Sequence, residues 1–167
     1  TGAAGFIGSK TVDELHDLGH DVISIDNESA TSNEKFYWHK EVRGWKHDIC
    51  DAGAIDAVFA YHKPDAVLHC AAQARIQIGF DSPLDTYKTN YLGTVTLLEA
   101  CIEHKCKRFV FASTSSSYGL ANDIPLKEEY ETDCLTPYSI SKIAAEKACK
   151  DYHKNWGIET MMLRYFN

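Results

Sequence analysis

A tyrosine and a lysine that stand four residues apart, Tyr138 and Lys142, are the first candidates for acid–base chemistry. Positions i and i+4 share one face of a helix, so the phenol and the ammonium can face the same cleft. A phenol of ordinary pKa is a poor base at neutral pH, but a neighbouring ammonium favours the phenolate and lowers that pKa. We therefore predict that Tyr138 is a general base for an alcohol or sugar hydroxyl. The same spacing is also typical of a plain side-chain pair on a helix surface.

A cluster of hydroxyl side chains, residues 113–117 (STSSS), follows the apolar run at 108–112. If that run is a strand, the hydroxyls stand at its carboxyl end, where they can hydrogen-bond a substrate oxygen. The alternative is a serine-rich turn without a ligand.

The chain opens on a glycine-rich stretch, TGAAGFIG. Glycine lets the backbone approach a pyrophosphate closely, and the helix predicted from Phe6 points its free N–H groups at the negative charge. Taken alone, the stretch is also compatible with a turn that binds nothing. The residues predicted to contact a cofactor here are Gly2, Gly5, Phe6, Ile7 and Gly8.

An acidic residue at the end of the next predicted strand strengthens this interpretation. Asp26 stands 18 residues after Gly8, close to the spacing of the acid that binds ribose in dinucleotide-binding folds. A carboxylate accepts hydrogen bonds from the 2′-hydroxyl and repels a 2′-phosphate, so the sequence predicts NAD rather than NADP. The alternative is that Asp26 only caps the strand end. Asp48 can accept from the adenine amino group, although Asp48 and Asp51 can equally cap a helix. The predicted contacts also include the neighbouring Asn27 and Ile49.

Short apolar runs alternate with helical patterns along the whole chain. The runs are nearly continuous in apolar residues, as in a parallel sheet that is covered on both faces. This alternation predicts right-handed βαβ units and a doubly wound, Rossmann-like parallel α/β sheet, whose ligands bind outside the carboxyl ends of the strands. The predicted strands are 21–25, a weak one ending near 47, 65–69, 108–112 and 159–163.

Helices are predicted at 6–18, 54–61, 87–104 and 137–156, and two of them stop at Gly19 and Gly157. Residues 28–43 and 119–136 break the alternation and are predicted loops. The second loop lies between a strand and a helix, where binding loops usually occur. The apolar stripe of the third helix is predicted to comprise Leu92, Val95, Leu98 and Ile102.

Composition and charge narrow the class of protein. The 167 residues have the length of one domain, which we interpret as an NAD-binding domain over 1–167. The net charge of −7 argues against a nucleic-acid partner, and the absence of a long apolar run argues against a membrane span. Six cysteines without a C-x-x-C pair indicate free thiols in a reducing, cytoplasmic compartment. The eight histidines show no metal-ligand spacing, so we expect no metal site.

Six short motifs occur in the order found in the extended short-chain dehydrogenase/reductase family, and the whole chain resembles that family. Six motifs in order are far more specific than any one of them. Within its NAD-dependent epimerase/dehydratase members, the chain most resembles nucleotide-sugar 4-epimerases of the UDP-glucose 4-epimerase type. The motifs are residues 1–8 (TGAAGFIG), 69–72 (HCAA), 90–93 (NYLG), 113–119 (STSSSYG), 138–142 (YSISK) and 163–167 (LRYFN).

The resemblance implies roles for individual residues. Tyr138 resembles the family's catalytic base, and Lys142 resembles its partner and a ligand of the nicotinamide ribose. Thr114 matches the catalytic Ser/Thr, and Asn90 matches an asparagine that holds local structure near the active-site helix. The further cofactor contacts that it implies are Ala71, Ala72, Asn90, Ser113, Tyr138, Lys142, Tyr165 and Phe166, and the substrate contacts are Thr114, Ser115, Tyr138 and Asn167.

The implied activity is a round trip at carbon 4 of a nucleotide-linked sugar, such as a UDP-hexose, UDP-N-acetylhexosamine or UDP-uronate. Tyr138 takes the 4-hydroxyl proton while hydride passes to NAD, the 4-keto sugar turns over, and hydride returns to the opposite face. Related 4,6-dehydratases carry Asp-Glu directly after the catalytic threonine, whereas this chain has Ser115 and Ser116, which weighs against dehydration. A decarboxylase, a reductase and a non-catalytic NAD-binding sensor stay open as alternatives.

The resemblance also implies parts outside the printed sequence. The family has a central strand before the position of Thr1 and a nucleotide-sugar-binding region after that of Asn167. We therefore expect an internal fragment of a longer enzyme. We expect the whole enzyme to be a homodimer, because relatives often pair the helices that correspond to 87–104 and 137–156.

Overall fold

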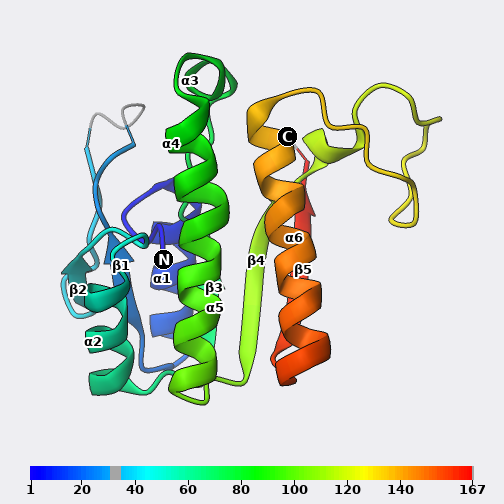
Figure 1. Ribbon diagram of the computed structural model, residues 1–167. Helices are drawn as coiled ribbons and strands as arrows, with labels where there is room; N and C mark the ends of the chain where they lie inside the picture. The colour runs from blue at the N-terminus through cyan, green and yellow to red at the C-terminus, as the bar shows by residue number, and fades with distance from the viewer. Residues whose placement is uncertain (31–34, 167) are drawn as a thin grey trace.

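Parallel strands and the helices between them form a layered α/β structure (Figure 1). The computed structural model describes residues 1–30 and 35–166. The strands are β1 (Ile23–Asp26), β2 (Arg43–Lys46), β3 (Ala66–His69), β4 (Arg108–Thr114) and β5 (Glu159–Tyr165). The helices are α1 (Phe6–Asp17), α2 (Ala52–His62), α3 (Ile76–Asp81), α4 (Pro83–Tyr87), a π-helical turn (Lys88–Leu92), α5 (Gly93–Glu103), a 3₁₀ turn (Ser115–Tyr118) and α6 (Pro137–Trp156).

Helices cover both faces of the strands. Helices α2, α5 and α6 lie on one face, while α1 lies on the other (Figure 1). All the strand pairs are parallel, β1 with β2, β3 with β4, and β4 with β5. This arrangement confirms the predicted doubly wound parallel sheet. Within the described ranges, no helix is long and apolar enough to cross a bilayer.

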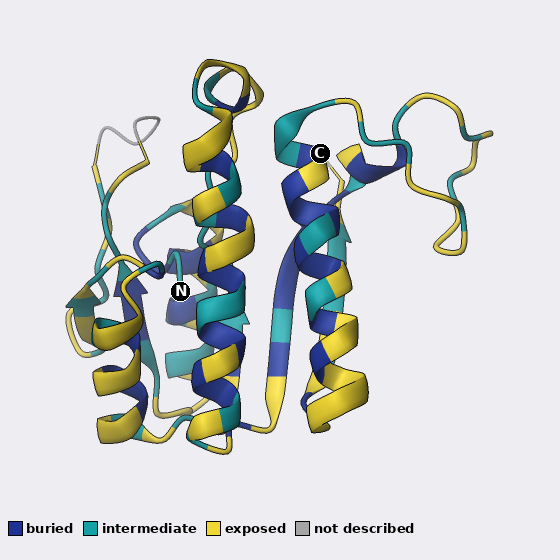
Figure 2. Ribbon diagram, in the orientation of Figure 1, coloured by how far each residue is buried: buried dark blue, intermediate teal, exposed yellow. Residues whose placement is uncertain are grey.

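The registers bring the carboxyl ends of the strands to one edge. Thr114 of β4 stands beside Tyr165 of β5, and His69 of β3 stands beside Phe111 of β4. Each predicted strand is present within about two residues of its predicted bounds, because buried parallel strands leave nearly continuous apolar runs in the sequence. Side chains such as Phe109 and Phe111 on β4 and Leu98 on α5 form the buried core between the sheet and its helices (Figure 2).

The single helix predicted over 87–104 is wrong in its start and in one residue of its buried stripe. It is replaced by α4, a five-residue π-helical turn and α5. Leu98 of the predicted stripe is buried, and Val95 and Ile102 pack against the core. Leu92 lies in the π-helical turn, whose i→i+5 spacing differs from that of an α-helix, and is 53% exposed. Leu97, outside the predicted stripe, is also fully buried. The short helix α3 was also not predicted, because six residues give too little periodicity to detect.

The first residues of the chain join the two groups of strands. The Thr1 nitrogen donates to the Leu68 carbonyl at 2.7 Å, and the Cys70 N–H donates to the Thr1 carbonyl at 3.1 Å. On the other side, the Ala3 N–H donates to the Ile25 carbonyl at 3.3 Å. Thr1 to Ala3 therefore occupy one strand position between β3 and β1.

Below this junction, the strand position continues as a cavity of about 430 Å³. Both strand edges and the helices α1 and α2 line it with apolar side chains, including Ile23, Ile25, Val67, Val12 and Phe59. The cavity lies where the family resemblance expects a central strand. Unpaired main-chain groups on facing edges accept a further strand readily.

A short apolar strand that fills this cavity should therefore stabilise the chain. We expect the 167-residue chain to unfold without a cooperative transition, and we expect five added residues rich in Val and Ile ahead of Thr1 to restore one. Differential scanning calorimetry measures this, with a Gly/Ser extension of equal length as the control. A sharp transition in the unextended chain, or an equal gain from both extensions, would contradict the prediction.

Candidate cofactor and catalytic site

The glycine loop is built for close backbone approach. Gly2 has a φ of +68°, and a Cβ there would lie 2.5 Å from the Ala71 nitrogen. A Cβ on Gly8 would lie 2.0 Å from the Gly2 carbonyl oxygen. Helix α1 begins at Phe6 after Gly5, and no side chain caps it, so its first-turn N–H groups are available to an anion. Phe6 and Ile7 are 83% and 48% exposed, and neither lines the small cavity beside the loop.

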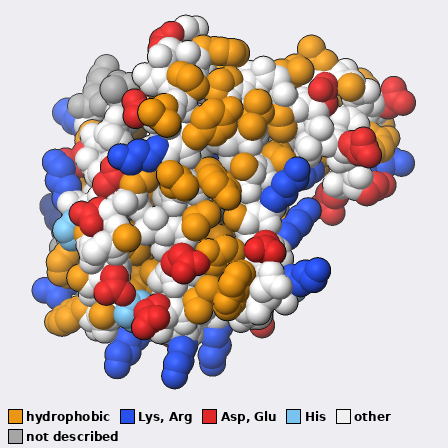
Figure 3. Space-filling view, viewed as in Figure 1, with side chains coloured by type: hydrophobic (Ala, Val, Ile, Leu, Met, Phe, Trp, Pro, Cys, Tyr) orange, Lys and Arg blue, Asp and Glu red, His pale blue; other side chains and the backbone are white. Residues whose placement is uncertain are grey.

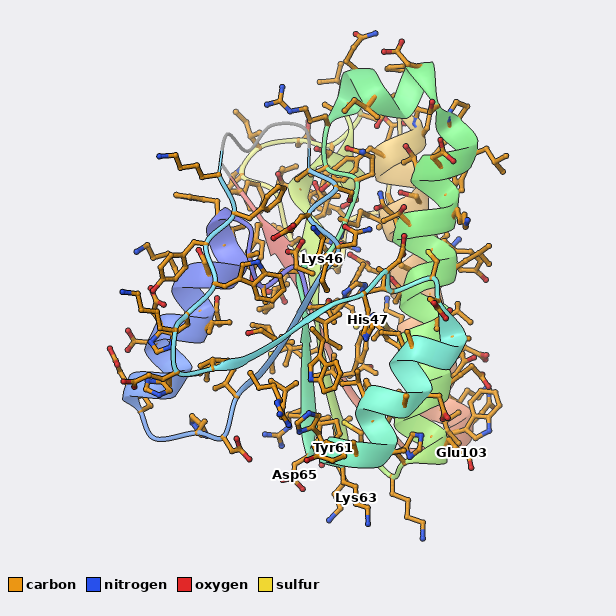
Figure 4. All side chains as sticks on the ribbon, turned by 90° about the vertical axis from the view of Figure 1, so that its left-hand side faces the viewer. Lys46, His47, Tyr61, Lys63, Asp65 and Glu103 are labelled. Carbon is orange, nitrogen blue, oxygen red and sulfur yellow. The ribbon has the colours of Figure 1, made fainter. Side chains whose placement is uncertain are left out.

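A cavity of about 100 Å³ lies beside this loop at the carboxyl edge of the sheet. Of the predicted contacts it is lined by Gly2, Gly5, Asp26, Asn27, Ile49, Ala71 and Ala72. It is also lined by residues that were not predicted, namely Ser29, Ala30, Phe36, His47, Cys70 and Thr89. His47 follows β2 at its carboxyl end, which Figure 4 shows beside Lys46, and that position could have identified it. Phe36 has no regular secondary structure, and no pattern in the sequence identified it as a cavity residue.

Asp26 has the structural role that its position at the strand end suggested, and its ribose contact stays a prediction. Its Oδ2 accepts from the Ala4 N–H at 3.0 Å, and its Oδ1 accepts from the Glu28 N–H at 2.7 Å. The carboxylate thus fixes the glycine loop to the end of β1. An ionised carboxylate has about four acceptor sites, so two remain for a ligand, and the side chain lines the cavity.

The two aspartates after β2 have separate tasks. Asp51 is the N-cap of α2 and accepts from the Ala54 N–H at 3.0 Å. Asp48 accepts from the Cys50 N–H at 2.8 Å and from Asn27 Nδ2 at 3.2 Å, so it closes a turn rather than capping the helix. An adenine contact by Asp48 stays a prediction.

The start of α6 fixes the predicted catalytic tyrosine. Thr136 accepts from the Ser139 N–H at 3.1 Å, and Ser139 Oγ accepts from the Thr136 N–H at 3.1 Å, which forms a reciprocal capping box. Pro137 occupies the first helical turn, where its missing N–H costs nothing. Tyr138 therefore sits in the first turn of a firmly started helix, with Lys142 one turn later.

Lys142 is buried and held from the strand side. Its ammonium donates to the Ala112 carbonyl at 2.8 Å and lies 4.6 Å from the centre of the Phe111 ring. Burial lowers the pKa of Lys142 to about 8. At neutral pH the ammonium is therefore the major form but loses its proton easily.

The predicted lowering of the Tyr138 pKa by Lys142 is wrong for this structure. Burial raises the pKa of Tyr138, and a hydrogen bond with Thr114 partly offsets that rise. The lysine does not contribute, because its ammonium is directed to the Ala112 carbonyl. The influence of Thr114 on the Tyr138 pKa nevertheless shows that two of the three predicted catalytic side chains lie near one another.

The hydroxyl cluster divides into different environments. Ser113 is buried and donates its hydroxyl to Glu146 on α6, so it faces the helix rather than the cavity. Thr114 is buried at the end of β4 and accepts from the Ser116 N–H at 3.1 Å. Ser115 is half-buried at the start of the 3₁₀ turn. The cofactor contact predicted for the Ser113 hydroxyl is therefore not supported.

A buried ion pair lies near the predicted catalytic residues and joins α6 to β5. Glu146, 3% exposed on α6, accepts from Arg164 of β5 at 2.9 and 2.8 Å. The guanidinium also lies 4.7 Å from the centre of the Tyr118 ring. Burial raises the pKa of the Glu146 carboxyl, but hydrogen bonds from Arg164 and Ser113 outweigh it and hold that pKa below its usual value. The pair ties α6 to the carboxyl ends of β4 and β5.

Asn90 has a structural part, and the cofactor contact predicted for its side chain is not supported. The side chain is 1% exposed on the π-helical turn. Its Oδ1 accepts from the Gln73 N–H at 2.7 Å, and its Nδ2 donates to the Gln73 carbonyl at 3.0 Å and to Ser141 at 2.9 Å. These bonds agree with the role in local structure that the resemblance implied.

The last predicted contacts lie at the end of β5. Tyr165 is 39% exposed and stands beside Thr114 in the ladder, at the carboxyl end of β5. Phe166 stacks on Tyr118 with the ring centres 6.3 Å apart. Asn167 lies outside the described residues. In the described part of the chain, no three His, Cys, Asp or Glu side chains gather as a metal site would require, and all six thiols are free.

The complete chain, residues 1–167, matches the NAD dependent epimerase/dehydratase family. The chain belongs to this family. The match confirms the family resemblance seen in the sequence, and the family description agrees with the predicted cofactor, NAD.

Named relatives within the family are epimerases. The chain is 37% identical over 166 residues to the UDP-glucose 4-epimerase of Rhizobium meliloti, and the match covers 99% of this chain and 50% of that protein. It is 34% identical over 178 residues to UDP-glucose 4-epimerase 2 of Arabidopsis thaliana, with 100% and 50% covered. The chain thus spans about half the length of the curated relatives that it matches.

Solved structures show the same arrangement. The UDP-glucose 4-epimerase of Thermotoga maritima, solved with UDP-glucose, superposes with a TM-score of 0.94 at 34% identity, covering 99% of this chain and 54% of that one. The Thermus thermophilus UDP-glucose 4-epimerase, solved in complex with NAD, gives a TM-score of 0.91 at 32% identity, with 98% and 53% covered.

The Glu146–Arg164 ion pair should stabilise the whole protein, and a substitution tests this. Glu146→Gln should lower the free energy of unfolding by about 3 kcal/mol, because it leaves the Arg164 charge without its buried partner. The folded-state pKa of Glu146 is depressed, so its contribution is complete above the usual carboxyl pKa and is lost as pH falls through the folded-state value.

Denaturant unfolding at neutral and acid pH measures this effect. The control is Glu159→Gln, which removes the acid of the exposed ion pair between Arg108 of β4 and Glu159 of β5. We expect no measurable shift from the control. A Glu146→Gln variant as stable as the control, or a loss that persists unchanged at acid pH, would refute the assignment.

Proposed function

We propose that the whole protein is an NAD-dependent nucleotide-sugar 4-epimerase. The observation that carries the proposal is that Thr114, at the end of β4, lies close enough to the Tyr138 phenol to affect its pKa, at the same sheet edge as the glycine loop. A phenol and a hydroxyl that meet beside a dinucleotide cradle are suited to a sugar alcohol that loses a proton and a hydride. The epimerase relatives support this choice of reaction.

The residues around the cavity fit NAD. Gly2, Gly5 and Gly8 keep the loop open to a pyrophosphate, since a Cβ on Gly2 or Gly8 would collide with backbone. Asp26 would accept from the ribose hydroxyls with its remaining acceptor sites, and its charge disfavours a 2′-phosphate. Ala71 and Ala72 would lie along the cofactor. When bound, NAD accepts a hydride from the sugar and returns it.

Tyr138 would move the proton of the sugar 4-hydroxyl. Its raised pKa keeps it protonated in this structure, so removal of a substrate proton requires added positive charge near the phenol. Lys142, one turn along the same helix, would supply that charge once its ammonium leaves the Ala112 carbonyl, which holds it in this structure. Thr114 would hold the sugar oxygen while it also bonds the phenol. Tyr165, at the same edge, would flank the reacting region.

Epimerisation fits this site better than dehydration. A 4,6-dehydratase needs a further carboxylic acid and base after the threonine. Here those positions are the half-buried Ser115 and the exposed Ser116, on the 3₁₀ turn. We propose a UDP-linked sugar as the substrate, because the similar structures include one with UDP-glucose. A cytoplasmic location stays a prediction.

Replacing the phenol tests the mechanism. Tyr138→Phe in the whole protein should lower kcat by a factor of about 10² to 10⁴, because it removes the acid–base group. NAD binding should change little, since the phenol is not part of the loop. The assay mixes enzyme, NAD and UDP-galactose, UDP-N-acetylgalactosamine or UDP-glucuronate, and measures the epimer formed.

Tyr61→Phe makes the same chemical change on the exposed side of α2 and serves as the control. Epimer without net NADH supports the proposal. A 4-keto-6-deoxy product would indicate a dehydratase, and NAD binding without any product would indicate a sensor. Nearly full activity in Tyr138→Phe would overturn the mechanism.

We also propose that the whole protein dimerises through α5 and α6. Apolar side chains gather over these helices on the face in view in Figure 3. A groove of about 420 Å³ runs between the two helices. It is lined by Tyr91, Val95, Ala144, Lys147, Ala148, Asp151 and Tyr152. Exposed apolar patches of this kind mark interfaces.

A charge placed in this groove should break the dimer. Ala144→Arg should convert the whole protein to monomer, because an unpaired guanidinium would be buried between subunits. Light scattering after size exclusion measures the molar mass. Leu18→Arg, on an exposed apolar residue at the end of α1, is the control. Two variants of equal mass would show that this face is not the interface.

A further inference from the structure

A fully buried histidine stands between the glycine loop and the helices of the catalytic side. His69 ends β3 and has no exposed surface. Its ring lies between Phe109 and Phe111, with ring centres 5.7 and 5.5 Å away. Both ring nitrogens have hydroxyl partners, Nδ1 with Thr1 Oγ1 at 2.7 Å and Nε2 with Thr94 Oγ1 at 3.0 Å.

The direction of these hydrogen bonds follows from the carbonyl at one end. Thr94 Oγ1 donates to the Asn90 carbonyl at 2.7 Å, and a carbonyl can only accept. The single hydroxyl proton of Thr94 is therefore used, so His69 Nε2 must donate to Thr94. In the neutral ring the proton is therefore on Nε2, and Nδ1 accepts the Thr1 hydroxyl. The geometry thus selects one of the two neutral tautomers.

The chain of bonds continues to the catalytic helix. Asn90, whose carbonyl accepts from Thr94, donates from Nδ2 to Ser141 Oγ at 2.9 Å. Ser141 in turn donates to the Tyr138 carbonyl at 2.7 Å. A continuous path of buried polar groups therefore joins the first residue of the cofactor loop to the backbone of the proposed base.

An apolar side chain would fill the same space between two phenylalanines. Burying an imidazole costs free energy unless both nitrogens are bonded, and a network of this kind gains by fixing one arrangement of its parts. His69 belongs to neither the proposed catalytic group nor the cofactor cavity. Its distinctive property is that it links the elements that carry those two sites.

We propose that His69 is a positioning residue whose neutral Nε2–H tautomer holds the cofactor loop at Thr1 in register with Asn90, Ser141 and the backbone of Tyr138. The catalytic half of this inference rests on the proposed function. The binding half concerns only the glycine loop of this protein and its anion. It does not depend on which reaction the protein catalyses.

The surroundings keep the ring neutral. Burial and the Lys142 ammonium on α6 lower the pKa of His69 well below its usual value. The remaining partners, Thr94 on α5 and the two phenylalanines on β4, carry no charge.

Two amide substitutions separate the hydrogen bond of His69 to Thr1 from its hydrogen bond to Thr94. In His69→Asn the side-chain oxygen can replace Nδ1 and keep Thr1, while the bond to Thr94 is lost. In His69→Gln the amide nitrogen can replace Nε2 and keep Thr94, while the bond to Thr1 is lost. In the whole protein we expect His69→Gln to raise the NAD dissociation constant about tenfold with kcat nearly unchanged, and His69→Asn to lower kcat about tenfold with NAD affinity nearly unchanged.

Thr94→Val should repeat the effect of His69→Asn, because it removes the same bond. Thr96→Val is the matched control, since Thr96 bonds the Leu92 carbonyl on the same helix at 3.0 Å and lies off the path. Equal effects of both histidine variants on both constants, or a Thr96→Val variant as impaired as Thr94→Val, would overturn the proposal.

A spectroscopic measurement needs no stable variant. In whole protein labelled with ¹⁵N at histidine, the His69 ring should show the Nε2–H tautomer from about pH 6 to about pH 8. An Nδ1–H tautomer, or titration in that range, would overturn the proposal even if the enzyme is an active epimerase. Conversely, if no epimer forms, the proposed function is wrong. The tautomer and the NAD dissociation constants then still test whether His69 positions the cofactor loop.

Discussion

The three residues that join β1 to β3 are the constraint on which the site depends. Thr1 bonds β3 on one side, and Ala3 bonds β1 on the other, so these residues set the distance between the two groups of strands. The same residues begin the glycine loop, and Gly2 approaches the backbone after β3 so closely that no side chain fits. The residues that join β1 to β3 therefore also form one wall of the proposed cofactor cavity. A change in their position would alter the shape of that cavity.

Helix α6 is held to the sheet by charges and hydrogen bonds as well as by apolar packing. Lys142 bonds the Ala112 carbonyl, and Glu146 pairs with Arg164 one turn later. Tyr138, Lys142 and Glu146 follow one another at four-residue spacing along one face of the helix. The residues that anchor the helix therefore also position the proposed base. Burial of such charges is expensive, but removal of one partner is more so. The helix therefore has one low-energy position against β4 and β5.

The sequence predicts this fold well because its strands are buried and its helices start with strong signals. The 137–156 helix has its predicted bounds, since Thr136 and Pro137 mark its start and Gly157 its end. The π-helical turn at Lys88–Leu92 left no signal, because its pattern differs from α-helical spacing by a single residue. Glycine positions and Asp26 were found from spacing. Phe36 and Thr89 were not, because tertiary folding alone brings them to the cavity.

The same burial acts on the proposed base and its lysine in opposite directions. It raises the pKa of Tyr138 and lowers that of Lys142 to about 8, since it disfavours phenolate and ammonium separately. Opposite charges compensate one another only at short range, so the ammonium favours the phenolate once it leaves the Ala112 carbonyl and approaches the phenol. The sequence motif placed the two groups one turn apart, but the Ala112 carbonyl decides where the ammonium lies. Acid–base function in this site therefore depends on a main-chain oxygen that no motif includes.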